Sequence, residues 1–325
     1  MKILIADSFP ELHQQMLIQE GHQLSIEPAL EGDSLTEAIE DHEILIVRST
    51  AVSAATLEAG HNLKLVIRAG AGTNTIDKPS ATELNIRVCN VPGANALAVA
   101  ELAMGLILCI DRNIPDNVAD LKQGVWNKKK YASARGLFGQ KIGILGLGAI
   151  GLALAERAHA FGMSVYAVQK PDRSVAAEQR IGAAGITQLQ SVDELLAEVD
   201  IVSLHMPATA ETNNVVDTDF LGKMKPGAML INTSRGELID ENALIAAMDD
   251  KGIRAGLDVY RNEPGSGDTE FHSALASHAN VYGTHHIGAS TDQAQVAVAD
   301  GVLEVIAAYA SGNFHNCVNP APQQH

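Results

Sequence analysis

Three chemically reactive side chains follow hydrophobic runs that have the length and composition of β-strands. Arg235 comes after the run at 229–232, Glu263 after the run at 254–259, and His286 after the run at 281–282. Ligands of open α/β sheets bind at the carboxyl ends of the strands, so we expect these side chains to converge at one edge. A histidine accepts a proton near neutral pH, a carboxylate stabilises the resulting imidazolium, and a guanidinium grips a carboxylate in two places. Together the three side chains could move a proton at a substrate that carries a carboxylate. Taken singly, Glu263 could be a turn carboxylate and Arg235 could cap a loop.

A glycine-rich turn stands between another predicted strand, at 141–145, and a predicted helix, at 152–161. The turn reads Gly146-Leu147-Gly148-Ala149-Ile150-Gly151, and a further strand at 164–168 follows the helix. In a dinucleotide fingerprint, the first glycine permits the tight turn, the second lets the backbone approach a pyrophosphate, and the third allows helix and strand to pack closely. We expect this turn to bind a dinucleotide, although such a turn can also be purely structural.

The residue that usually distinguishes NAD from NADP is not acidic in this sequence. An Asp or Glu about 20 positions after the glycine turn ordinarily binds the adenine ribose hydroxyls. Gln169 stands there, followed by Lys170, Asp172 and Arg173. A neutral amide does not repel a 2′-phosphate, which Lys170 and Arg173 could bind, whereas Asp172 would restore negative charge. The sequence leaves the cofactor open between NAD and NADP.

Hydrophobic runs and helix-period segments alternate along the chain, which predicts an α/β fold with parallel sheets. A first series of strands is expected at 3–6, 44–47, 65–67 and 86–89, with helices at 10–20, 34–40 and 53–59, the last two capped by Ser34 and Ser53. A second series of six strands is expected at 141–145, 165–168, 201–204, 229–232, 254–259 and 281–282. Residues 95–110 predict a buried helix that joins the two series, and residues 291–311 predict a helix that returns to the first.

The composition excludes several classes of protein. With 46% hydrophobic and 19% charged residues among 325, the chain is globular rather than disordered and long enough for two domains. Its 39 acidic and 23 basic residues disfavour nucleic acid and anionic membranes as partners. The N-terminal residues lack the apolar core of a signal peptide, and the longest apolar stretch is too short to span a bilayer. Three distant cysteines, Cys89, Cys109 and Cys317, suggest neither a disulfide framework nor a zinc site and fit a cytoplasmic protein.

The segments NTSRGELID, GLDVYRNEP and HHIGAST, together with GLGAIG, resemble the signatures of the D-isomer-specific 2-hydroxyacid dehydrogenases in order and spacing. The resemblance extends from Lys2 to Asn319. It implies two doubly wound parallel-sheet domains: a Rossmann dinucleotide-binding domain at 95–290, inserted into a discontinuous flavodoxin-like substrate domain at 1–94 and 291–325. It also implies an NAD(P)-dependent oxidation of a D-2-hydroxy acid, with Arg235, Glu263 and His286 as catalytic residues and His285 pointing to the other side of the chain.

The same resemblance assigns a larger set of residues to the cofactor and none to a metal. The cofactor set contains Gly146, Gly148, Ala149, Ile150, Gly151, Gln169, Lys170, His205, Met206, Pro207, Thr212, Thr233, Ser234, Asp258 and Gly288. The segments 95–110 and 114–131 resemble the family's subunit-contact region, so we expect a homodimer. The chain ends close to Asn319, where the family's core ends, so no appended regulatory domain is expected.

Within the family, the segments 47–50, 68–72, 91–95 and 126–130 resemble most closely the members that oxidise 3-phosphoglycerate in the first step of serine biosynthesis. Arg48 and Arg68, with Ala69, Gly70 and Arg235, would then bind the substrate, although the first two arginines could also be surface or salt-bridge residues. The alternatives are a glyoxylate or hydroxypyruvate reductase, which needs no phosphate pocket, and a dinucleotide-sensing binding protein. The family's usual residues are replaced at Gln169, His285 and Asn74-Thr75, which bears on cofactor and substrate more than on reaction type.

Overall fold

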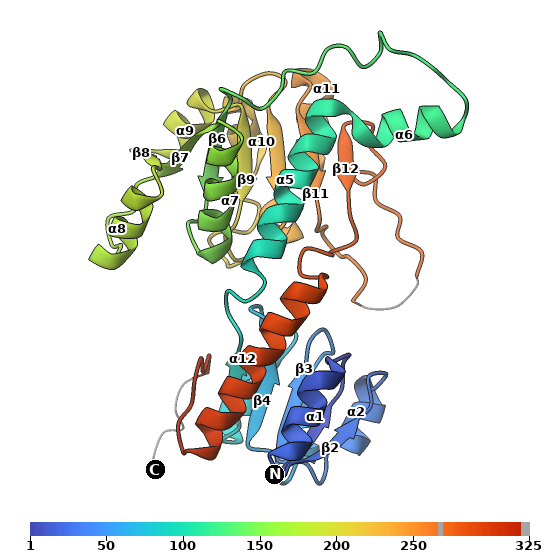
Figure 1. Cartoon of the computed structure of the whole chain (residues 1–325), viewed down its shortest axis with the longest axis vertical. Coiled ribbons are helices and arrows are strands. Elements are labelled where there is room, and N and C mark those ends of the chain that lie inside the picture. Colours follow the sequence, from blue (N-terminus) through green and yellow to red (C-terminus); the bar gives the residue numbers. More distant parts are fainter. Residues whose placement is uncertain (266–268, 320–325) are drawn as a thin grey trace. The chain divides into compact units, whose positions relative to one another are not determined.

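The computed structural model describes residues 1–265 and 269–319, which form two compact units (Figure 1). The first unit contains Met1–Asn95 and the residues from Ser290 onward, and the second contains Ala96–Pro264 and Thr269–Ala289. Residues 266–268 and 320–325, which belong to the predicted domain ranges, lie outside the described residues.

The first unit contains a five-stranded sheet in which each strand is parallel to its neighbours. Its strands are β1 (Lys2–Ile5), β2 (Gln23–Ile26), β3 (Ile44–Val47), β4 (Leu65–Arg68) and β5 (Arg87–Asn90), in the spatial order β2-β1-β3-β4-β5. Its helices are α1 (Glu11–Gln19), α2 (Gly32–Ala38), α3 (Ala54–Ala59), α4 (Lys78–Glu83) and α12 (Asp292–Ala310). The strand order is the flavodoxin-like order, so the predicted fold of this unit is confirmed.

Alternate residues of the first sheet face two different layers of helices. Ile3 and Ile5 share a buried cluster with Val302 of α12, and Figure 1 shows α1 and α12 across this face. Leu4 and the opposite-facing residues of the neighbouring strands pack on the other layer, which includes Leu35 of α2. Because both faces are covered, the central strands are hydrophobic throughout, which is what made them visible in the sequence.

The second unit contains a seven-stranded parallel sheet. Its strands are β6 (Lys141–Leu145), β7 (Ser164–Val168), β8 (Thr187–Leu189), β9 (Ile201–Leu204), β10 (Met229–Asn232), β11 (Arg254–Leu257) and β12 (Val281–Gly283), in the order β12-β11-β10-β9-β6-β7-β8. Counted within the unit, this is the Rossmann order with one added strand, and the order reverses between β6 and β9. The predicted Rossmann fold is therefore confirmed.

Helices cover both faces of the second sheet. The helices of this unit are α5 (Ala96–Arg112), α6 (Ile114–Lys122), which has no buried residue, α7 (Ala149–Ala160), α8 (Val175–Ala183), α9 (Val192–Glu198), α10 (Thr218–Lys223) and α11 (Glu241–Lys251), with a 3-10 turn at Gly236–Leu238. The helices α5 and α7 pack together on one face (Figure 1), while α9, α10 and α11 share the cluster on the other. The predicted buried helix is α5, in which Ala100, Ala103 and Ile107 have no exposed surface.

Two strands and one helix cap differ from the sequence prediction. β2 and β8 were not predicted, because each is an edge strand of its sheet and none of its residues is buried. The second sheet consequently has seven strands rather than six. Ser34 is not an N-cap: α2 begins after Glu31, and the Ser34 hydroxyl donates back to the Glu31 carbonyl at 2.9 Å. Ser53 is confirmed as a cap, since its hydroxyl accepts from the Thr56 N–H at 3.2 Å.

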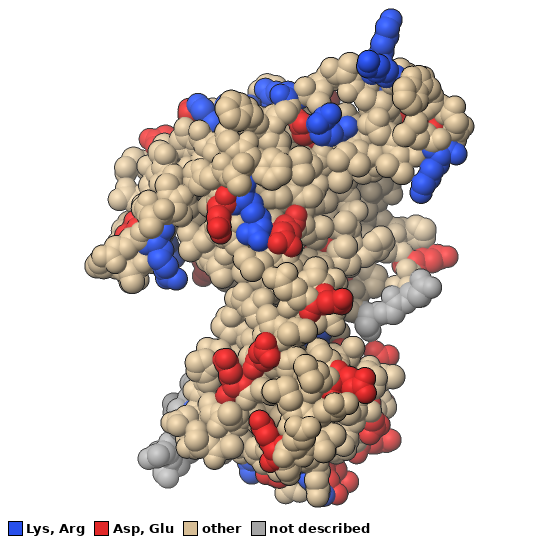
Figure 2. Space-filling view, viewed as in Figure 1, with Lys and Arg blue, Asp and Glu red and all other residues tan. Residues whose placement is uncertain are grey.

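The surface charge is unevenly distributed. Residues 1–95 contain more than twice as many acidic as basic side chains, and the face of the first unit drawn in Figure 2 is mainly acidic where it is charged. Among the described helices, none combines the length and apolarity that a membrane crossing requires. An anionic ligand of this chain therefore needs a local set of cations.

Candidate active site

The glycine turn after β6 packs tightly against the end of β9. Gly146 has a φ of +106°, and a Cβ on it would lie 2.2 Å from the carbonyl oxygen of His205, so only glycine fits. Two residues on, Gly148 differs: a Cβ there would meet no protein atom within 4 Å. The turn is thus held from one side and leaves open space on the other.

The helix that follows the turn begins without a side-chain cap. Gly148 precedes α7 and offers no side chain to its first N–H groups. In contrast, α8, α9, α10 and α11 each begin with a Ser or Asp whose side chain accepts a hydrogen bond from the backbone. The first N–H groups of α7, which include those of Ala149 and Ile150, are consequently available to an anion, and the helix dipole favours one.

Two exposed polar side chains, the amide of Gln169 and the ammonium of Lys170, follow the end of β7. Gln169 and Lys170 are exposed, and no ion pair of Lys170 is found within the described residues. Arg173 is committed elsewhere, because it donates to the Gln188 side chain at 2.6 Å and to the Val168 carbonyl at 2.9 Å. Of the two cations that the sequence offers to a 2′-phosphate, only Lys170 is without such bonds.

A partly buried histidine follows the end of β9. His205 bonds through Nε2 to the Ser203 hydroxyl at 2.8 Å, and its Nδ1 has no partner within the described part of the chain. Burial lowers the pKa of His205 to about 4, so its imidazole is neutral at physiological pH. Beyond Met206, the loop is closed by Thr212, whose hydroxyl donates to the Pro207 carbonyl at 2.7 Å.

The loop after β10 holds Arg235 by means of a buried asparagine. The Asn232 amide donates to the Arg235 carbonyl at 2.8 Å and accepts from the Ser234 N–H at 3.0 Å. The Ser234 hydroxyl donates to the Leu204 carbonyl at 2.6 Å, which fastens the loop to β9. Thr233 is nearly buried, and its hydroxyl has no partner among the described residues. Arg235 itself is half-buried.

The loops after β10 and β11 touch through their backbones. A Cβ on Gly236 would lie 2.1 Å from the carbonyl carbon of Tyr260, so glycine is required for this approach. The Tyr260 N–H donates to Glu263 Oε2 at 3.0 Å. Arg235 and Glu263 are therefore carried by two loops that cannot separate without losing this contact.

Glu263 and His286 form a hydrogen-bonded pair. Nδ1 of His286 bonds to Oε1 of Glu263, and His286 occupies the left-handed region with a φ of +53°. Burial alone would raise the pKa of Glu263, but the hydrogen bonds from His286 and Tyr260 and the positive charge of His286 and Arg235 lower it below its ordinary value. Glu263 thus stays ionised beside the imidazole. His285 is exposed and makes no hydrogen bond or ion pair within residues 1–265 and 269–319.

The turn that carries His286 is organised by Asp258, which is 1% exposed. Its Oδ1 accepts from the Thr284 hydroxyl at 2.6 Å and from the Ile287 N–H at 2.8 Å, and its Oδ2 accepts from the Gly288 N–H at 2.8 Å. The His286 N–H donates to the Asp258 carbonyl at 2.8 Å. Both carboxylate oxygens of Asp258 are directed at this turn.

The first unit carries its own candidate site residues at one sheet edge. Val47 and Arg68 are paired across the parallel strands β3 and β4, so Arg48 and Arg68 lie at neighbouring carboxyl ends, with Ala69 and Gly70 next along the chain. Asp7 holds the loop after β3, accepting from the N–H groups of Arg48 at 2.6 Å and Thr50 at 3.1 Å. Sequence reasoning missed Asp7, as it missed Tyr260 and Asn232, because each acts through hydrogen bonds that involve loop backbone and exist only in the folded chain.

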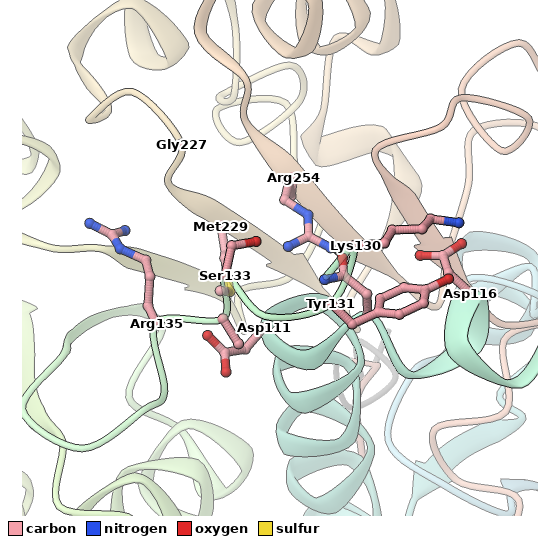
Figure 3. Close-up of a pocket in the computed structure, with 11 residues that line it drawn as sticks. Asp111, Asp116, Lys130, Tyr131, Ser133, Arg135, Gly227, Met229 and Arg254 are labelled. Carbon is pink, nitrogen blue, oxygen red and sulfur yellow. Dashed lines mark hydrogen bonds between the residues drawn. The ribbon is translucent and has the colours of Figure 1, made fainter. Parts of the chain in front are cut away.

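A cavity of about 320 Å³ opens beside the amino ends of β10 and β11 in the second sheet (Figure 3). Its lining includes Met229 and Arg254, the first residues of β10 and β11, together with Lys130, Tyr131 and Arg135. Figure 3 shows Arg135 directed away from the other two cations. Because Arg235, Glu263 and His286 follow the carboxyl ends of the same sheet, this cavity is separate from the candidate active site.

Residues 104–288 match the family described as "D-isomer specific 2-hydroxyacid dehydrogenase, NAD binding domain". The chain belongs to this family. It is 37% identical over 324 residues to D-3-phosphoglycerate dehydrogenase of Methanocaldococcus jannaschii, covering 98% of this chain and 59% of that protein. It is 38% identical over 309 residues to hydroxypyruvate reductase of Thermotoga maritima, covering 94% of this chain and 97% of that protein.

A solved structure has a similar fold. The acyclic imino acid reductase Bsp5 in complex with NADPH and D-Arg superposes with a TM-score of 0.84 at 28% identity, covering 98% of this chain and 100% of that one. The chain spans 59% of the length of the Methanocaldococcus relative, so part of that protein has no counterpart among these residues. The second unit is the NAD-binding domain of the family.

Proposed function

We propose that the protein oxidises a D-2-hydroxy acid with NAD or NADP, and that the acid is 3-phosphoglycerate. The observation that carries the proposal is the placement of Arg235 and the Glu263–His286 pair beyond the carboxyl ends of three adjacent strands of the NAD-binding unit. The glycine turn follows the same end of β6. The proton acceptor, its carboxylate partner and a cation are thus on the edge where a dinucleotide would lie.

The residues at this edge fit a dinucleotide. The open space at Gly148 and the uncapped first turn of α7 suit a pyrophosphate. The hydroxyl of Thr233, which follows β10, has no partner among the described residues and suits a polar group of the cofactor. The bound nicotinamide supplies the chemistry that no side chain offers, which is acceptance of a hydride.

His286 acts as the base in this proposal. Its Nδ1 is engaged by Glu263, so Nε2 is the nitrogen left to take the proton of the substrate hydroxyl. The ionised Glu263 then stabilises the imidazolium and fixes the orientation of the ring. Arg235 uses one N–H on the Ser234 carbonyl at 2.6 Å and has four others with which to grip the substrate carboxylate.

Asp258 takes a different role from the one that the resemblance implies. Since both its oxygens accept hydrogen bonds from the turn at 284–288, we assign it to holding His286 in place rather than to contact with the cofactor. Gly288 belongs to the same turn, because its buried N–H donates to Asp258.

The choice of cofactor depends on Gln169 and Lys170. The amide of Gln169 carries no charge to repel a 2′-phosphate, and Lys170 is exposed beside it. The relative Bsp5 was solved with NADPH, whereas the family model is that of an NAD-binding domain. We therefore propose that the protein accepts both cofactors.

Two observations support 3-phosphoglycerate as the substrate. Arg48 and Arg68 lie at neighbouring strand ends of the first unit, where a pair of guanidinium groups suits a phosphate. The relative from Methanocaldococcus jannaschii is a D-3-phosphoglycerate dehydrogenase. The second candidate is a hydroxypyruvate reductase, which is favoured by the Thermotoga maritima relative because this chain covers 97% of its length.

Initial rates with 3-phosphoglycerate, hydroxypyruvate, glyoxylate and 2-oxoglutarate, each with both cofactors, test the proposal. We expect His286→Ala to lower kcat about 100-fold or more and Arg235→Lys to raise KM for the acid, because an ammonium does not reproduce the guanidinium fork. His285→Ala is the matched control and keeps its activity. If none of the four acids is turned over with either cofactor, the proposed dehydrogenase activity is wrong and the alternative of a dinucleotide-binding protein remains.

Substitution in the first unit separates the two candidate substrates. Arg48→Ala and Arg68→Ala should each weaken the binding of 3-phosphoglycerate by about 1.5–3 kcal/mol, which is the contribution of a charged hydrogen bond. Hydroxypyruvate, which has no phosphate, should be affected much less. Equal losses for both acids would contradict the phosphate assignment.

We also propose that the protein is a homodimer. The helix α6 and the residues after it expose apolar side chains, among them Leu121 at 56% and Trp126 at 79%. Exposed apolar surface of this kind marks an interaction site, and two-fold association is the commonest assembly. Light scattering should give twice the 34.3 kDa of the chain, and a monomer at micromolar concentration would exclude the dimer.

A cytoplasmic location stays a prediction from the sequence.

A further inference from the structure

The residues after α12 return along the edge strand β5 and pair with it. The Val318 N–H donates to the Val88 carbonyl at 2.8 Å, and the Asn90 N–H donates to the Asn316 carbonyl at 3.2 Å. The Asn319 side chain closes the pairing by accepting from the Val88 N–H at 2.9 Å. We call residues 316–319 the return segment. It covers the edge of the five-stranded sheet that β5 forms.

This pairing sets Cys317 directly opposite Cys89 in an antiparallel bridge. The two backbone hydrogen bonds belong to the residues on either side, so the cysteines form a non-hydrogen-bonded pair. In such pairs the Cα atoms are about 4.5 Å apart and the side chains are closer than elsewhere in a sheet. That separation is within the range of roughly 4.4–6.8 Å that a disulfide spans. Cys89 and Cys317, which are far apart in the sequence, are therefore neighbours in the fold, and both are free thiols in this structure.

The two thiols differ in access and in acidity. Cys89 has no exposed surface, while Cys317 is partly exposed. Burial, followed by the neighbouring Cys317, raises the pKa of Cys89 to about 12. A thiol that is buried and protonated does not attack an oxidant in solution, so Cys317 is the thiol that an oxidant reaches first.

We propose that Cys89 and Cys317 form a reversible disulfide that fastens the return segment to β5. With hydrogen peroxide as oxidant, the Cys317 thiol becomes a sulfenic acid and releases one water. The Cys89 sulfur then attacks the Cys317 sulfur, a second water leaves, and the disulfide forms. The two thiols lose two protons and two electrons in total, and the peroxide is reduced to two waters. An external dithiol reverses the step by exchange.

Oxidation of the purified full-length chain by hydrogen peroxide, followed by mass spectrometry, tests the proposal. We expect an intact mass lower by two hydrogen atoms and a proteolytic peptide that joins residues 89 and 317. Because the bond closes a loop between these positions, the oxidised chain should migrate faster on a non-reducing denaturing gel, and dithiothreitol should restore the original band. Its thermal unfolding midpoint should also rise relative to the reduced protein.

Cys109 provides the matched control. It is partly buried like Cys317 but lies on α5, in the second unit. Cys109→Ser should keep the fast band, and Cys89→Ser and Cys317→Ser should each abolish it. The proposal is overturned if oxidised wild type carries stable sulfenic or sulfinic acid on Cys317 with no linked peptide, or if Cys109→Ser alone removes the band.

Discussion

Asp258→Ala is the substitution that most sharply tests how His286 is held. It removes the acceptor of hydrogen bonds from the Thr284 hydroxyl and from the N–H groups of Ile287 and Gly288. A hydrogen bond to a charged group contributes about 1.5–3 kcal/mol. The Thr284 hydroxyl can rotate and Ile287 is 44% exposed, so water replaces part of their loss, whereas the Gly288 N–H is buried. We expect the free energy of unfolding to fall by about 3 kcal/mol.

The kinetic consequence distinguishes the two roles open to Asp258. If it anchors the turn, His286 loses its position against Glu263, and a displacement of about 1 Å is enough to lower kcat about 100-fold. The Kd of NADH, measured by its fluorescence on binding, should then change little. If Asp258 instead contacts the cofactor, the Kd of NADH should rise by a larger factor than kcat falls. Urea unfolding followed by circular dichroism measures the stability of the same variant.

Asp217→Ala is the control for the loss of a carboxylate that bonds to backbone. Asp217 caps α10 by accepting from the Phe220 N–H at 2.9 Å, away from the 284–288 turn. Its removal should cost about 1 kcal/mol of stability and leave kcat unchanged. An Asp258→Ala variant with wild-type stability and wild-type kcat would refute the anchoring role.

Three further outcomes are expected. Gly148→Ala should keep wild-type stability, because its Cβ meets no protein atom within 4 Å, but it should bind NADH weakly, because the Cβ enters the space proposed for the pyrophosphate. Gly146→Ala should also lose stability, since its Cβ would lie 2.2 Å from the His205 carbonyl oxygen. Equal urea midpoints for the two variants would contradict this difference. The pKa of Glu263 is lowered in the folded state, so its contribution to stability is present above the ordinary value of 4.5 and is lost as the pH falls below it. Acid titration of the urea midpoint should be less steep in Glu263→Gln than in wild type. Gln169→Asp should shift the ratio of kcat/KM toward NAD by restoring a charge that repels the 2′-phosphate, and an unchanged ratio would show that this side chain does not contact the ribose.

The sequence predicted which side chains share a sheet edge but not what holds them there. Arg235, Glu263 and His286 each follow a hydrophobic run, and parallel strands bring such positions together. The support given by Asp258 could not be predicted, because it depends on a turn in which His286 adopts a φ of +53°. No hydrophobic period encodes that conformation, and the assignment of Asp258 to the cofactor, which the resemblance to the family implies, stays a prediction.

The central strands were predictable because helices cover both their faces and make them hydrophobic throughout. β2 and β8 lack that signal, since none of their residues is buried. The pairing of Cys89 with Cys317 is harder still to predict, because the whole second unit lies between the two cysteines in the sequence. Sequence separation alone made these cysteines look unrelated.

The composition of the first unit's core has a consequence for synthesis of the chain. Ile3 and Ile5 of β1 pack in one cluster with Val302 and Ile306 of α12. Every residue assigned to the second unit is translated before α12. Since domains generally fold as units while the chain emerges from the ribosome, the NAD-binding unit can complete its core while β1 is still waiting for its partners. During that interval the hydrophobic face of β1 is not covered by α12. The nascent chain can therefore aggregate through its N-terminal residues, which are translated first.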